Sequence, residues 1–171
     1  MGSLLNQKIL DNLIHLRMAN LYSLEKYKED HRILINYEEQ IFSQNGEDGI
    51  TAEIFRRIGV TNKIFVELGV GNGLENNTVF LLLEHWKGFW FEGNKKNVKK
   101  IKNGFANLIN EKKLKIEEEF IKKETINTTL KKNSVPNEFD LLSIDIDGND
   151  YFILDSIANF NPRVIIIGTK I

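Results

Sequence analysis

The sequence contains no cysteine and only two prolines among its 171 residues. Without cysteine the chain can form no disulfide, and it has neither a thiolate nucleophile nor a cysteine ligand for zinc. Neither sign of charge dominates, because 23 lysines and arginines oppose 24 aspartates and glutamates for a net charge of −1. Strong binding to nucleic-acid phosphates normally requires a basic excess, so no nucleic-acid partner is predicted.

Long apolar runs are also missing. No stretch approaches the roughly 20 residues of a membrane-spanning helix, and the N-terminus lacks the basic and apolar regions of a signal peptide. Hydrophobic residues make up 42% of the chain and charged residues 27%, which is ordinary for a globular protein. These features predict a cytoplasmic protein without membrane contact.

Two parts of the chain differ in pattern. Residues 4 to about 26 carry apolar side chains at helical spacing, including Leu5, Ile9, Leu13 and Leu16. Residues 1–40 are therefore expected to form an N-terminal helical extension, which packs on the core or on a second subunit. Residues 41–171 are expected to form the main domain.

Within the main domain, short apolar runs alternate with helical segments. A helix is predicted over residues 47–58. After it, strands are predicted over 63–68, 88–93, 114–121, 139–146 and 163–169, alternating with helices over 76–86, 95–109, 125–133 and 150–158. This order predicts an α/β fold, with a Rossmann-like, doubly wound, mainly parallel sheet and helices on both faces.

The first strand of the alternation ends in a glycine-rich stretch, FVELGVGNGLENNT (65–78). Gly69, Gly71 and Gly73 allow a tight turn and let a ligand approach the backbone at the carboxyl edge of the sheet. The G-x-G-x-G spacing differs from the dinucleotide pattern G-x-G-x-x-G. Glu67, two positions before the first glycine, would repel a pyrophosphate and suits a cationic ligand.

The next predicted strand ends in another acid. Glu92 lies 19 positions after Gly73, where a carboxylate can accept hydrogen bonds from both hydroxyls of a ribose. A surface acid at the end of a strand is the simpler alternative. Taken with the glycines, Glu92 favours a nucleoside that carries positive charge.

Three aspartates lie at the end of the fourth predicted strand, in the sequence SIDIDGND (143–150). Asp145 and Asp147 are two residues apart and can converge on one side of the strand. Converging carboxylates favour a cation or a proton between them, so they predict either a Mg²⁺ site or a metal-free general base. Asp150 is expected to cap the following helix, and Asp147 could equally belong to a turn with Gly148.

Several of these motifs resemble known proteins. VELGVGNG (66–73) and the final acid of GFWFEG (88–93) resemble the first two motifs of class I methyltransferases that use S-adenosyl-L-methionine. Further blocks are similar to the FkbM-like methyltransferases, namely SQNGEDGI (43–50), INTTL (126–130), LLSIDIDGNDYFIL (141–154) and NPRVIII (161–167). The likeness covers about residues 41–167.

This resemblance implies a role for each matching residue. The three glycines would line the methionine and ribose parts of the cofactor, Glu67 would lie near the methionine end, and Glu92 would hold the ribose. Adenine would lie near residues 120–125. Gln44, Glu47 and Asp48 would cover the amino-acid end of the cofactor or the substrate entrance. Asp145 would project into the active site beside Asp147.

The family likeness further implies O-methylation of a sugar hydroxyl, with a glycan or a small glycosylated metabolite as acceptor. A non-catalytic nucleoside-binding or scaffold module is the alternative, and a nicotinamide-dependent oxidoreductase is a weaker third. The family's sheet has seven strands, whereas the predicted strands here end with the fifth. The apolar edge at residues 163–169, or the N-terminal helix, is therefore expected to support a homodimer.

Overall fold

The computed structural model describes residues 31–146 and 148–168. The helix predicted over residues 4–26 and the side chain of Asp147 lie outside this part of the chain. The elements in order are the 3-10 helix η1 (Leu34–Tyr37), α2 (Glu47–Ile58), β1 (Ile64–Leu68), α3 (Val79–Leu83), β2 (Lys87–Glu92), α4 (Lys95–Gly104), α5 (Ala106–Asn110), β3 (Leu114–Glu118), α6 (Ile126–Lys132), β4 (Glu138–Ile144), α7 (Asp150–Ser156) and β5 (Asn161–Ile167).

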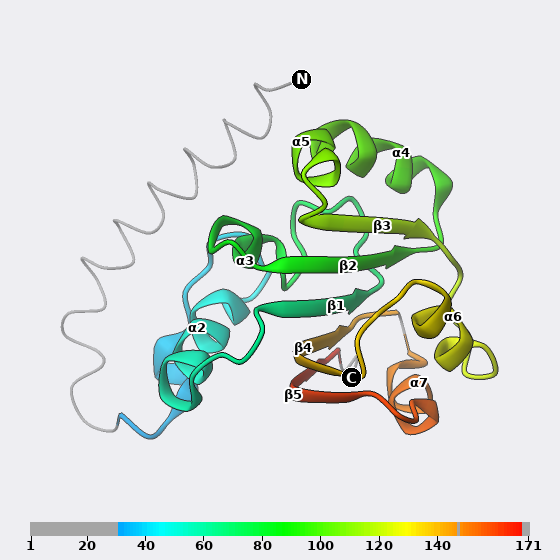
Figure 1. Cartoon of the computed structure of the whole chain (residues 1–171). Coiled ribbons are helices and arrows are strands. Elements are labelled where there is room, and N and C mark those ends of the chain that lie inside the picture. Colours follow the sequence, from blue (N-terminus) through cyan, green and yellow to red (C-terminus); the bar gives the residue numbers. More distant parts are fainter. Residues whose placement is uncertain (1–30, 147, 169–171) are drawn as a thin grey trace.

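The five strands form one sheet in the order β3-β2-β1-β4-β5 (Figure 1). Every neighbouring pair is parallel, and β1 lies at the centre. From β1 the chain adds β2 and then β3 on one side of the sheet. It then crosses back and adds β4 and β5 on the other side of β1. The chain therefore has the predicted Rossmann-like, doubly wound α/β fold, whose ligands bind beyond the carboxyl ends of the strands where the order reverses.

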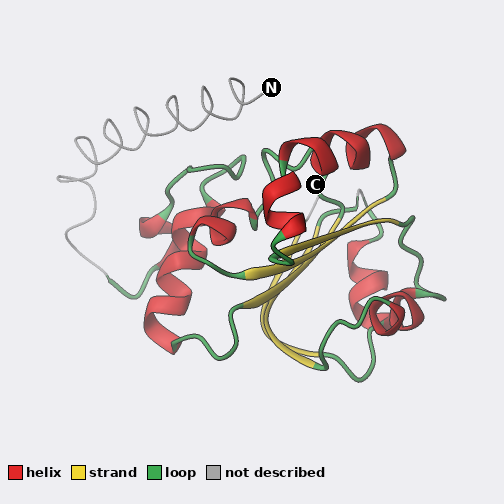
Figure 2. Cartoon of the chain, turned by 45° about the horizontal axis from the view of Figure 1, so that its top comes forward, coloured by secondary structure: helices red, strands yellow, loops and turns green. Residues whose placement is uncertain are grey.

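Helices cover both faces of the sheet (Figure 2). Alternate residues of each strand point to opposite faces, and the buried apolar side chains accordingly form two clusters. Phe65 and Trp90 pack with residues of α2, α3 and α4. Val66 and Phe91 pack with residues of α6 and α7 on the other face. No helix in the described ranges is long and apolar enough to cross a membrane.

Two differences from the predicted elements are caused by tertiary contacts. The helix predicted over 95–109 is two helices, because Phe105 leaves helical geometry (φ −109°, ψ 20°) and inserts its ring against Trp90. β5 begins two residues before the predicted start at 163, because Asn161 pairs with Glu138 and Pro162 with Phe139. Proline is tolerated there because β5 is an edge strand.

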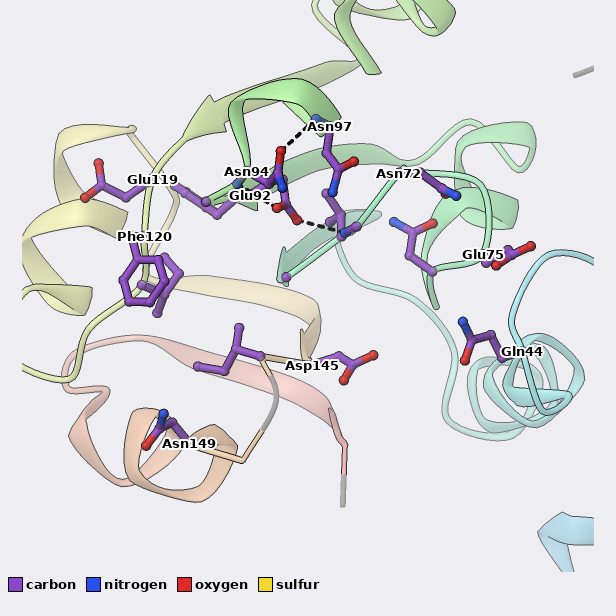
Figure 3. Close-up of a pocket in the computed structure, with 18 residues that line it drawn as sticks. Gln44, Asn72, Glu75, Glu92, Asn94, Asn97, Glu119, Phe120, Asp145 and Asn149 are labelled. Carbon is purple, nitrogen blue, oxygen red and sulfur yellow. Dashed lines mark hydrogen bonds between the residues drawn. The ribbon is translucent and has the colours of Figure 1, made fainter. Parts of the chain in front are cut away.

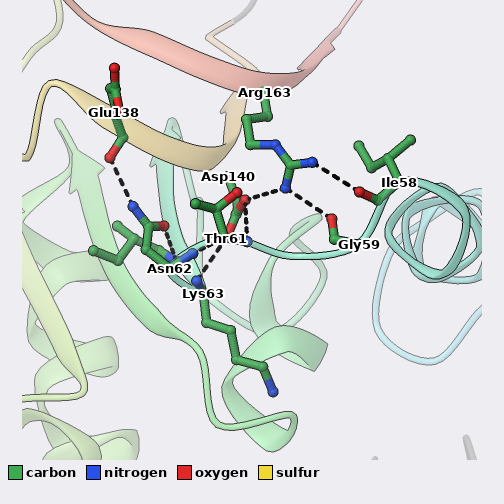
Figure 4. Close-up of polar contacts among 9 residues, drawn as sticks. Ile58, Gly59, Thr61, Asn62, Lys63, Glu138, Asp140 and Arg163 are labelled. Atoms are coloured by element: carbon green, nitrogen blue, oxygen red, sulfur yellow. Dashed lines mark hydrogen bonds and ion pairs between the residues drawn. The ribbon is translucent and has the colours of Figure 1, made fainter.

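At the amino-terminal edge of the sheet, the buried carboxylate of Asp140 joins three segments (Figure 4). It accepts backbone hydrogen bonds from residues 61–63, which precede β1, at 2.8–3.0 Å. It also pairs with Arg163 of β5 at 2.9 Å. Arg163 donates in addition to the carbonyls of Ile58 and Gly59 at the end of α2. This cluster fixes α2, β1, β4 and β5 to one another at the edge opposite the strand ends where ligands bind.

Burial alone would raise the pKa of Asp140. The guanidinium of Arg163 and the backbone N–H groups outweigh that effect and hold the pKa below its ordinary value of 3.8. A carboxyl group with a lowered folded-state pKa stabilises the fold above its unfolded-state pKa. That stabilisation is lost as the pH falls through the folded-state value.

We expect Asp140→Asn to lower the free energy of unfolding by about 2–4 kcal/mol at neutral pH, because it leaves Arg163 without its carboxylate partner. The difference in stability from wild type should narrow as the pH falls from 3.8 through the lower folded-state pKa, because the unfolded wild-type chain then binds a proton that the folded chain does not. Urea denaturation at a series of pH values measures both effects. Glu138→Gln, at an exposed position of the same strand, is the control and should change stability little. Equal losses in the two variants would contradict the role of Asp140.

Candidate functional site

A pocket of about 700 Å³ opens at the carboxyl ends of β1, β2 and β4 (Figure 3). It lies at the edge where the strand order reverses, which is the expected ligand site of this fold. Its walls come from the loops after β1, β2, β3 and β4 and from the segment before α2. The lining residues are Gln44, Gly69, Val70, Gly71, Asn72, Glu75, Asn76, Phe91, Glu92, Gly93, Asn94, Asn97, Glu119, Phe120, Ile121, Asp145, Ile146 and Asn149.

The glycine loop forms one wall. Gly69 and Gly71 line the pocket, and both have positive φ (82° and 55°). A Cβ on Gly69 would lie 2.0 Å from the carbonyl oxygen of Asp145, so the β1 and β4 loops can approach this closely only with glycine here. A Cβ on Gly71 would meet no atom within 4 Å. Gly73 does not line the pocket but faces Ile101 of α4, so its place in the motif serves packing.

Glu92 lies where its predicted role requires, at the end of β2 in the pocket wall, and it is 8% exposed. One carboxylate oxygen accepts a hydrogen bond from the N–H of Gly71 at 2.8 Å, and the other accepts one from the N–H of Asn94 at 2.7 Å. Each carboxylate oxygen has a further lone pair for a ligand donor. Glu92 therefore orders the glycine loop and presents a fixed carboxylate to the pocket. Its contact with a ribose stays a prediction.

Glu67 takes a position that the sequence did not indicate. It is 1% exposed and is not part of the pocket wall. Its carboxylate accepts hydrogen bonds from the side chains of Asn76 (2.7 Å) and Thr78 (2.5 Å), from the N–H of Asn77 (3.0 Å) and from the hydroxyl of Ser143 (3.2 Å). Glu67 thus anchors the segment after the glycine loop to the centre of the sheet. Direct contact with a cationic ligand stays a prediction.

Burial raises the pKa of Glu67 to about 7, although the hydrogen bonds from Thr78, Asn77 and Ser143 oppose the shift. The charge of Asp145 adds to the increase. A carboxyl group with a raised folded-state pKa favours folding below its unfolded-state value of 4.5. Above that value the unfolded chain binds fewer protons than the folded one, so stability falls until the pH reaches about 7.

Of the three residues near the start of α2 that were predicted to cover the cofactor or the substrate entrance, only one lines the pocket. Gln44 lines the pocket, whereas Glu47 does not and accepts hydrogen bonds from the backbone and side chain of Asn45. Asp48 is fully buried, and one carboxylate oxygen accepts N–H groups of Ile41 and Ser43 at 2.8–2.9 Å. Desolvation raises the pKa of Asp48, and these hydrogen bonds lower it. Asp48 therefore shapes the segment that presents Gln44.

Of the aspartates after β4, Asp145 lines the pocket and its side chain extends from the end of the strand (Figure 3). The prediction that Asp150 caps α7 is wrong, because Asn149 is the N-cap and no described side chain caps this helix. Asp150 is the first residue of α7, and its carboxylate accepts N–H groups of Ile146 and Gly148 in the preceding loop. Asp147 lies outside the described residues, so its convergence with Asp145 stays a prediction. In the ranges that the structure describes, no cluster of three or more metal-ligating side chains occurs.

The sequence did not single out most of the polar pocket residues. Asparagines at 72, 76, 94, 97 and 149 contribute to the wall, and Glu75 and Glu119 add two carboxylates to those of Glu92 and Asp145. None of the described residues around this pocket is lysine, arginine or histidine. Phe120, which is 72% exposed, stands at the side formed by the β3 loop. The pocket is therefore polar and negatively charged, with one aromatic ring at its margin.

No family model and no curated protein matches the chain. Solved structures with partial likeness to it include the following two. The methyltransferase domain of METTL16 is 12% identical with a TM-score of 0.45, covering 63% of this chain and 44% of that one. A S-adenosylmethionine-dependent methyltransferase from Clostridium acetobutylicum is 16% identical with a TM-score of 0.42, covering 82% and 47%. The chain thus spans less than half the length of either. The fold assignment rests on the strand order and register described above.

Replacing Glu67 by Gln should remove the pH dependence that this buried carboxyl group imposes on folding. Between pH 4.5 and about 7 the stability of wild type should decline relative to the variant, by up to about 3 kcal/mol. Denaturant unfolding of both proteins across this range measures the difference. Glu118→Gln, at an exposed strand end, should follow wild type. Parallel stability curves for wild type and Glu67→Gln would show that Glu67 keeps an ordinary pKa.

Proposed function

We propose that the pocket binds S-adenosyl-L-methionine and that the protein is a methyltransferase. The observation that carries this proposal is the charge of the pocket. Four carboxylates line it, and none of its described lining residues is basic. Such a site favours a cationic ligand over a dinucleotide, whose pyrophosphate is negatively charged. When bound, S-adenosyl-L-methionine supplies a methyl group activated by its positively charged sulfur.

The residues present fit this ligand. Asn76 is 8% exposed and donates through its Nδ2 to Glu67, while its Oδ1 accepts no hydrogen bond from the described part of the chain. A buried acceptor left open beside the pocket suits an ammonium donor such as that of an amino-acid moiety. Glu92 can accept from ribose hydroxyls, and the exposed ring of Phe120 offers a surface on which a purine can stack.

We further propose that the acceptor is a sugar hydroxyl, as the FkbM-like sequence motifs imply. Transfer to such an oxygen requires the acceptor to be aligned with the methyl group and to lose its proton. Asp145 is the candidate base, because it is the carboxylate that the end of β4 directs into the pocket, on the opposite side from Glu92. The proton would pass from the sugar hydroxyl to a carboxylate oxygen of Asp145.

Calorimetric titration tests the binding step. S-adenosyl-L-methionine and S-adenosylhomocysteine should each bind with a stoichiometry near one, and NAD should not bind. Glu92→Gln should weaken binding of both adenosyl ligands by about 10–100-fold, since a charged acceptor of the ribose is lost. Glu118→Gln removes a neighbouring carboxylate that does not line the pocket and should leave affinity unchanged. Binding of NAD in place of the adenosyl ligands would overturn the proposal.

Asp145→Asn separates catalysis from binding. The variant should keep its affinity for S-adenosyl-L-methionine within a few-fold but lose methyl transfer by about 10²–10⁴-fold, because the acceptor hydroxyl loses its base. Transfer of a radiolabelled methyl group to a panel of free and glycosylated sugars provides the readout. Wild type that binds the cofactor but methylates no acceptor would instead favour a non-catalytic nucleoside-binding module. Unchanged turnover in the variant would exclude Asp145 as the base.

A further inference from the structure

A second hollow lies along the outer edge of β3, the last strand on one side of the sheet that the structure describes, and it is remote from the strand ends that form the first pocket. Its volume is about 650 Å³, and residues 114–116 of β3 form part of its wall. Four lysines surround it, at positions 87, 102, 112 and 115, and no acidic residue is among its described lining residues. The apolar side chains of Phe89 and Ile109 also contribute. We refer to this hollow as the β3 groove.

The backbone of β3 is arranged so that an additional strand can pair with it. Gly88 of β2 donates to the carbonyl of Lys113, and Glu119 donates to the carbonyl of Glu92. In a parallel ladder alternate residues bond to the neighbouring strand, so odd-numbered residues at this edge face β2. Leu114 and Ile116 therefore turn their N–H and C=O groups toward the groove. An edge of this kind is a template for a further strand.

The lysines lie on both sides of that edge. Lys102 and Lys112 belong to the side covered by α4 and α5. Lys115 lies on the opposite side, where it pairs in register with Phe89 and donates to the carbonyl of Asn133 after α6. It also contacts Glu117 at 3.4 Å, an exposed ion pair of small energy. A strand added to β3 would point alternate side chains to the two sides and meet lysines on each.

The positive charge of the four lysines determines which kind of strand can pair with β3 in the groove. A second copy of β3 carries lysines as well as glutamates along its edge, whereas a purely acidic segment complements the four lysines without bringing further lysines to the groove. A nucleic acid would satisfy the lysines, but its sugar–phosphate backbone does not offer donors and acceptors at strand spacing. We propose that the β3 groove binds an extended acidic peptide segment by strand addition, with main-chain pairing to Leu114 and Ile116 and with acidic side chains facing the lysines. This inference is independent of the proposed methyltransferase function.

A fluorescently labelled peptide of alternating glutamate and valine, about ten residues long, is the probe. Fluorescence anisotropy at about 0.15 M salt, where exposed charges are screened beyond about 8 Å, measures its affinity. Lys102→Glu/Lys112→Glu should weaken binding at least about tenfold. Lys122→Glu/Lys123→Glu makes the same charge change at exposed positions of the loop after β3, outside the groove, and should weaken binding by less than about twofold, because those charges lie beyond the opposite end of the strand.

Two further measurements test the pairing itself. The same peptide N-methylated throughout keeps its charges but cannot donate hydrogen bonds, and it should bind at least about tenfold more weakly. Hydrogen exchange should show new protection of the amides of Leu114 and Ile116 on addition of the unmodified peptide. Equal binding of the N-methylated peptide, or of a DNA oligonucleotide of equal charge, would overturn the proposal. So would equal loss in the two lysine variants, or sedimentation showing a dimer that Lys102→Glu/Lys112→Glu dissociates.

Discussion

The described structure depends most on one buried carboxylate at the centre of its sheet. Glu67 sits on the middle strand and receives hydrogen bonds from three consecutive residues of the following loop and from Ser143 of β4. Trp90 of β2 reaches the same group through the hydroxyl of Thr78. The side chain of Glu67 thus connects three strands and the loop after β1 through hydrogen bonds. The position of Asn76 in the pocket wall follows from that anchor.

Much of the fold could be predicted from the sequence because the apolar periodicity is strong. The bounds of α2 agree with the residues predicted, since its apolar stripe ends at Ile58 and Gly59 terminates it. The interruption at Phe105 could not be predicted, because its ring is oriented by Trp90, which is distant in sequence. The early start of β5 likewise depends on pairing with β4, a tertiary contact that periodicity does not encode.

The candidate site was predictable only where a residue's place on a strand determines its environment. Glu92 ends β2 and Asp145 directly follows β4, so the parallel topology alone brings them to the pocket edge. Glu67 lies one residue before the end of β1, still within the strand. Its side chain therefore points into the protein interior, beneath the loop. The asparagines are common in turns throughout the chain, and nothing in the sequence distinguishes those of the pocket, such as Asn97, from exposed ones. Only the folded structure shows which asparagines line the pocket.

The acidity of the pocket has a consequence for turnover. In the proposed reaction the ligand arrives with a positively charged sulfur and leaves with a neutral one. Attraction to the four lining carboxylates therefore weakens at the moment of methyl transfer, and the spent cofactor is held less tightly than the fresh one. The charge that selects the ligand would then also favour its exchange after methyl transfer.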